Sequence, residues 1–116
     1  MRRLVSTAGH SGQAAGGLDG LEAQAVQQLF EDVGRNQWRA GYPLPTLLGA
    51  FQAGARVAWR HVSAVALAAA VDPEGLAVLG GALFELVDQL SSAAAAGFVA
   101  EQEEAALSQQ LSLIHI

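Results

Sequence analysis

The chain is 116 residues long, carries a formal charge of −5 at pH 7, and is 52% hydrophobic. This length accommodates a single domain, and the absence of cysteine excludes disulfides, thiolate metal sites and cysteine nucleophiles. Eleven acidic residues against six arginines argue against nucleic-acid binding, because neutralising phosphates requires a basic surface.

Alanine dominates the composition. It occupies 24 positions, whereas only seven residues are aromatic. Alanine has the highest intrinsic helix propensity but adds little apolar area, and the β-branched residues are too scattered for a sheet. We therefore predict an all-α fold, an antiparallel bundle of three closely packed helices.

The N-terminal third divides into an irregular segment and a helix. Residues 1–20 contain five glycines and show no hydrophobic period, so we predict a disordered or non-native segment. A first helix is predicted over residues 21–40, ended by Gly41. Gly34 interrupts it at a cost of about 1 kcal/mol relative to alanine. The apolar stripe of this helix comprises Leu21, Ala25, Leu29 and Val33.

The second predicted helix, residues 44–70, carries the strongest hydrophobic period. Apolar residues recur at alternating steps of four and three over about seven turns, which is typical of a helix that packs along its whole length. Pro45 is tolerated because it falls in the first turn. The members of this stripe are Leu44, Leu48, Phe51, Ala55, Ala58, Val62, Val65 and Ala69.

The third predicted helix, residues 73–107, begins with Asp72 as its N-cap and Pro73 at its first position. The connection to the preceding helix is so short that the two must form an antiparallel hairpin. Its stripe comprises Leu76, Leu79, Leu83, Leu86 or Val87, Leu90, Ala94 and Phe98. Glycines on or near the stripe would let another helix approach closely, and these are Gly75, Gly80, Gly81 and Gly97.

The third helix is also apolar beyond this stripe, at Val78 and Phe84. Three helices cannot cover all of this surface, so a missing helix or a second subunit must do so. We expect a homodimer through the second and third helices, in a four-helix arrangement. The residues expected in the core or in this interface are Leu44, Leu48, Phe51, Val62, Leu79, Leu83, Leu86, Leu90 and Phe98.

The last six residues, 111–116, depart from the Glu/Gln/Ala composition that precedes them. One set of codons for them, CTG-TCT-CTT-ATA-CAC-ATC, is the mosaic-end adaptor of transposase-based sequencing libraries. We therefore predict that they are adaptor read-through rather than a frayed apolar tail. The helical domain is then expected to occupy residues 21–110 and to continue beyond Gln110.

Short motifs follow one another in a characteristic order between Gly34 and Glu101. They are Gly34-Arg35, Gly41-Tyr42-Pro43-Leu44, Leu47-Leu48, Phe51, Gly54-Ala55-Arg56, Trp59, the run from Leu83 to Ser91, and Gly97-Phe98 with Glu101. Their order and spacing resemble the helical N-terminal domain of the RsbT co-antagonist (RsbRD) type. In GC-rich bacteria this domain commonly begins PucR-type (CdaR-like) transcriptional regulators.

The resemblance implies a regulatory or sensory and dimerisation domain. In such regulators it precedes a central domain and a C-terminal helix-turn-helix domain, so the downstream output domain is an implied partner. The alternatives are an RsbR-type stress-signalling scaffold, where a STAS domain follows, and a small-ligand sensor with an anionic effector between its helices.

Arginines are the candidates for binding such an effector, because guanidinium groups bind carboxylate and phosphate bidentately. The candidate site comprises Arg35, Arg56, Arg60 and Trp59. The competing interpretation is ion pairing within the bundle, and we favour it because acids outnumber bases. The acids expected to pair are Glu31, Asp32, Glu85 and Asp88.

Catalysis, metals and cofactors are not expected. His61 has no acidic or histidine partner one turn away, so no metal or haem site is predicted. No Ser–His–acid set is spaced on rigid elements, and Glu101, Glu103 and Glu104 are expected to form a solvated acidic turn. Met1-Arg2-Arg3 begins like a signal peptide but lacks the apolar run, and the longest charge-free stretch is too short and proline-broken to span a membrane. We expect a cytoplasmic protein.

Overall fold

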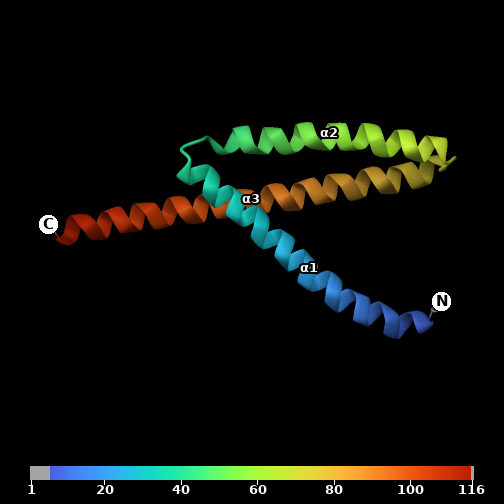
Figure 1. Cartoon of the computed structure of the whole chain (residues 1–116), viewed down its shortest axis with the longest axis horizontal. Helices are drawn as coiled ribbons and strands as arrows, with labels where there is room; N and C mark the ends of the chain where they lie inside the picture. The colour runs from blue at the N-terminus through green and yellow to red at the C-terminus, as the bar shows by residue number, and fades with distance from the viewer. Residues whose placement is uncertain (1–5, 116) are drawn as a thin grey trace.

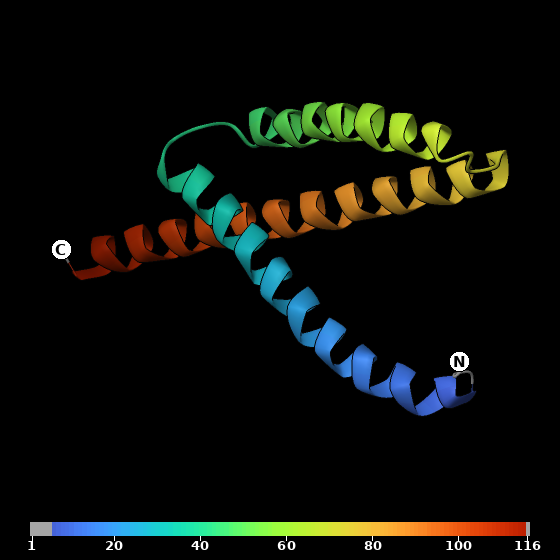
Figure 2. The same ribbon diagram turned by 45° about the vertical axis from the view of Figure 1, so that its right-hand side comes forward.

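The computed structural model describes the backbone of residues 6–115 and the side chains of residues 20–114. This part of the chain forms three helices and no strand, which confirms the all-α prediction: α1 Ser6–Arg39, α2 Leu44–Ala68 and α3 Pro73–His115. The helices α2 and α3 lie side by side and antiparallel, whereas α1 crosses α3 toward its own C-terminal end and its N-terminal half diverges from α3 (Figures 1 and 2).

The α2–α3 hairpin forms as its short connection requires. Asp72 caps α3 as predicted, because its carboxylate accepts a hydrogen bond of 2.7 Å from the backbone N–H of Gly75. The end of α2 is closed by a 2.9 Å hydrogen bond from the Val71 N–H to the Ala66 carbonyl. Ala70 takes the left-handed conformation that this closure demands, with φ of 61°, although glycine would adopt it with less strain.

Gly41 ends α1 in the same way, with φ of +80°. The Tyr42 N–H reaches back to the Gln37 carbonyl at 3.2 Å, and the Gln37 side chain donates to the carbonyl of Pro43 at 3.0 Å. These bonds turn the chain sharply from α1 into α2, as the glycine and the prolines predict.

The terminal segments differ from the sequence-based expectation. The backbone of residues 6–20 is helical in the structure, where we expect disorder, and α3 continues to His115 rather than ending near residue 107. Extending a helix that has already formed costs little per residue, even for a poorly patterned segment. Residues 1–5 and Ile116 lie outside the described part, and the origin of residues 111–116 stays a prediction.

Small residues form the buried core of the described part of the chain, and apart from Ala66 of α2 they lie where α1 crosses α3. Gly34 of α1 and Gly97, Ala93 and Ala94 of α3 are buried. A Cβ atom added to Gly34 would overlap the carbonyl oxygen of Ala94, and one added to Gly97 would overlap the carbonyl oxygen of Glu31. The two helix backbones therefore touch directly at this crossing.

The large apolar residues are at most half-buried within the single chain. Six of the nine residues expected in the core or interface are half-buried in the chain, and these are Leu44, Leu48, Phe51, Leu83, Leu90 and Phe98. The other three, Val62, Leu79 and Leu86, are exposed. The physical reason is that α2 and α3 form a single layer, so each large side chain has neighbours on one side only.

The length and composition of α3 would also allow it to cross a membrane. This is weak evidence, because an apolar helix of a soluble bundle passes the same test. Glu85 and Asp88 interrupt its apolar surface, and its middle packs against the backbone of α1.

The close contact at the crossing predicts that two glycine substitutions in α3 change the free energy of unfolding in opposite directions. Gly97→Ala should lower the free energy of unfolding by about 1–3 kcal/mol, because the new methyl group meets backbone that cannot move aside. Gly81→Ala is the matched control, since nothing lies within 4 Å of its added Cβ. It should raise stability by about 0.5–1 kcal/mol. Urea denaturation followed by circular dichroism measures both, and equal effects would contradict the contact.

Candidate functional site

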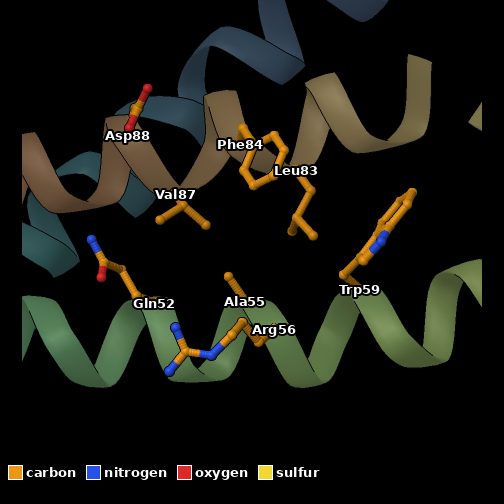
Figure 3. Close-up of a pocket in the computed structure, with 8 residues that line it drawn as sticks. All are labelled: Gln52, Ala55, Arg56, Trp59, Leu83, Phe84, Val87 and Asp88. Atoms are coloured by element: carbon orange, nitrogen blue, oxygen red, sulfur yellow. The ribbon is translucent and has the colours of Figure 1, made fainter. Parts of the chain in front are cut away.

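A groove with a volume of about 320 Å³ lies between α2 and α3. Figure 3 shows side chains of both helices projecting into it, with Ala55 and Trp59 directed toward α3 and Leu83 and Val87 toward α2. The lining is completed by Gln52, Arg56, Phe84 and Asp88.

A glycine shapes one end of this groove. The indole ring of Trp59 lies against Gly80 of α3, where a Cβ atom would be 3.4 Å from the ring. The floor of the groove is apolar. The lining of the groove also includes one basic residue, Arg56 of α2, and one acidic residue, Asp88 of α3. Such a surface suits a small molecule with a flat apolar body and a polar end. In the described residues no cluster of three His, Cys, Asp or Glu side chains is placed to hold a metal ion.

The structure divides the predicted effector residues between two places. Arg56 and Trp59 line the groove, whereas Arg60 is exposed on α2 and is not part of the lining. Arg35 lies at the α1–α3 crossing, where its Nη1 is 3.0 Å from Glu101 and 3.2 Å from Glu104. A single effector site containing both Arg35 and Arg56 is therefore not formed within one chain.

The ion pairs at the crossing form one connected network. Glu101 also accepts hydrogen bonds from Arg39, 2.9 Å from its Nε and 3.2 Å from its Nη2. Its side chain is only 15% exposed. Beside the network, the rings of Trp38 and Phe98 pack edge to face at 5.5 Å, which closes the contact between the end of α1 and α3.

The network perturbs the titration of its members. The hydrogen bond from Arg39 lowers the pKa of Glu101 below its ordinary value, against the opposing effect of partial burial, and the bond from Arg35 lowers it further. The hydrogen bonds to Glu101 in turn raise the pKa of both guanidinium groups. Glu101 is therefore charged at all but acidic pH.

The preference for ion pairing is right for Arg35, but the expected partners and the expected solvation of Glu101 are wrong. The sequence analysis predicts partners at residues 31, 32, 85 and 88. Instead α1 crosses α3 obliquely and brings its last turns to residues 98–104. One sequence signal points to the correct pairing, since Arg35 directly follows Gly34 and Glu101 follows Gly97 by one helical turn.

The lowered pKa of Glu101 predicts a pH dependence of stability. A carboxyl group whose folded pKa is depressed stabilises the fold above its ordinary value of 4.5, and this contribution disappears as the pH falls through the folded pKa. Glu101→Gln should therefore melt at a lower temperature than wild type at neutral pH, and the difference should shrink toward zero in acid. Thermal melts over a pH series measure it.

The control for this substitution is Glu103→Gln, which removes a neighbouring exposed acid that makes none of these contacts. Its melting temperature should follow that of wild type at every pH. A Glu101→Gln difference that persists unchanged in strong acid would contradict the role of the network.

Comparison with known proteins identifies the family. The family model described as RsbT co-antagonist protein rsbRD N-terminal domain matches residues 2–113. The match covers nearly the whole chain, including residues 2–20 and residues 111–113. No curated protein and no solved structure matches it. The chain that forms this small-residue crossing and its ion-pair network therefore belongs to the family of RsbT co-antagonist protein rsbRD N-terminal domains.

Proposed function

We propose that the chain is the N-terminal regulatory and dimerisation domain of a PucR-type bacterial transcriptional regulator, acting in the cytoplasm. The observation that carries the proposal is the family match together with the ordered motifs from Gly34 to Glu101. The domain is proposed to have no catalytic or DNA-binding activity of its own, consistent with its acidic charge.

The course of α3 supports a role in passing a signal to a downstream domain. The helix has 43 residues and is about 65 Å long, and the described residues from 102 to 114 are all exposed beyond the crossing. A helix displaced at the crossing moves as a rigid rod, so a change in the α1–α3 angle would reach its C-terminal end. The bonds of Arg35 and Arg39 to Glu101 hold this angle.

Two alternatives share the same fold. In an RsbR-type scaffold the same domain would precede a STAS domain. In a ligand sensor an anionic effector would bind between the helices, and the groove at Arg56 and Trp59 favours this second alternative. Asp88 belongs to the same lining, with its carboxylate directed away from α2 (Figure 3).

The coding sequence that follows this domain in the gene tests the proposal. We expect it to encode a central domain followed by a helix-turn-helix domain. A STAS domain in that position would replace the proposal with the scaffold alternative, and an enzymatic domain would contradict both.

The sensor alternative predicts a ligand-dependent rise in stability. A small carboxylate or purine that binds the groove, present at about 100 times its dissociation constant, should stabilise the chain by about 2.7 kcal/mol. Arg56→Gln should abolish this thermal shift, whereas Arg60→Gln, one turn away and outside the groove, should keep it. A complete absence of shifts across such a panel would contradict the sensor alternative.

A further inference from the structure

One face of the α2–α3 hairpin is apolar and uncovered. A depression of about 430 Å³ on it is lined by His61, Val62, Val65, Ala66, Ala69, Val71 and Leu79. We call this surface, with the neighbouring Leu86, the open face. Val65, at its centre, is 69% exposed. No acidic residue and no arginine belongs to the lining, whereas Arg56 and Asp88 line the other groove.

The open face continues the surface on which α1 packs. Leu79, Leu86, Leu90, Ala93 and Gly97 follow one another at steps of seven, four, three and four, so they form one stripe along α3. Toward its C-terminal end this stripe is buried under α1. Toward the hairpin turn it is uncovered, because α1 diverges from α3 after the crossing (Figures 1 and 2).

The part of α1 beyond the crossing is uncovered as well. Every described residue from Gly20 to Leu29 is exposed, and we call residues 20–29 the arm. Leu29 is 56% exposed and lies five residues from Gly34, about 140° around the helix, so it faces away from α3. An isolated helix of this kind is marginal in water and needs a surface to pack on.

The chain is more extended, and exposes more surface, than a compact monomer of its size. Its radius of gyration is 19.9 Å, against about 13 Å for a compact domain of this length. Its accessible surface is 7978 Å², against about 6,000 Å² for a compact monomer of 12.0 kDa. The excess is comparable to what each subunit of an obligate homodimer buries, and part of it belongs to the exposed residues 102–114 of α3 beyond the crossing.

We propose that a second copy of this chain covers the open face with its arm, and that the exchange is reciprocal. A two-fold axis would cover both exposed surfaces at once, since each copy supplies one arm and one open face. The two α1 helices then form a middle layer between the two hairpins. The absence of acidic residues from the lining of the open face suits a chain with a charge of −5, because acidic surfaces of two such copies would repel each other.

This inference rests on the dimerisation part of the proposed function and specifies how the copies meet. Light scattering on the 116-residue chain should give a dimer. Val65→Glu should weaken that dimer roughly 100-fold or more, because the new carboxylate would be buried against the partner's arm. Val57→Glu is the matched control on the same helix, at a position that is 51% exposed and outside the open face. It should leave the dimer intact.

The arm is tested separately. Leu29→Glu should also dissociate the dimer, whereas Gln24→Glu, at another exposed position of the arm, should not. Circular dichroism should show that all four variants stay helical, because each substituted side chain is exposed in the single chain.

The outcomes distinguish a failure of the proposed interface from a failure of dimerisation itself. A dimer that responds to Val65→Glu but not to Leu29→Glu would overturn the arm exchange and keep dimerisation. A dimer that tolerates Val65→Glu would overturn the open face as the interface. A wild-type monomer would overturn dimerisation altogether.

Discussion

The direct contact of two helix backbones at Gly34 and Gly97 is the constraint on which the rest of this structure depends. Two α-helices normally stand 8–10 Å apart, at a distance set by the side chains between them. Here each helix presents a position without a side chain to the backbone of the other. The oblique course of α1 across α3 follows, because only a crossing at one point lets two such short surfaces meet.

The crossing explains both the ion-pair network and the exposure of the large apolar residues elsewhere in the chain. It brings Arg35 and Arg39 to Glu101, and Trp38 to Phe98, so polar and aromatic contacts flank the glycine contact. Small residues bury little apolar area, so the stability gained at this site is modest. Away from the crossing the helices diverge, and large residues such as Leu79 and Leu86 remain uncovered.

The α2–α3 hairpin consequently has two faces of different character. One face carries the groove, whose largely apolar lining includes Arg56 and Asp88. The other is the open face, whose lining has no acidic residue and no arginine. A regulatory domain can use such a division, since one face can contact a second subunit while the other remains accessible to a ligand. Because α3 contributes to both faces and to the crossing, a change at any of these places would act on the same helix.

The sequence by itself determined the number of helices and the ends that flank the two connections, because caps, breakers and periodicity are local properties, but it did not determine where α1 begins or where α3 ends. Pro43, Pro45, Gly41 and the Asp72-Pro73 pair mark the helix ends correctly, and the short connection at Asp72 requires the hairpin. Only the tertiary structure decided which residues are buried and how the arginines pair. Gly34 lowers the helix propensity of its segment, but in the fold it lets α1 pack against the backbone of Ala94, a residue 60 positions away. No periodicity of one helix encodes the angle at which another crosses it.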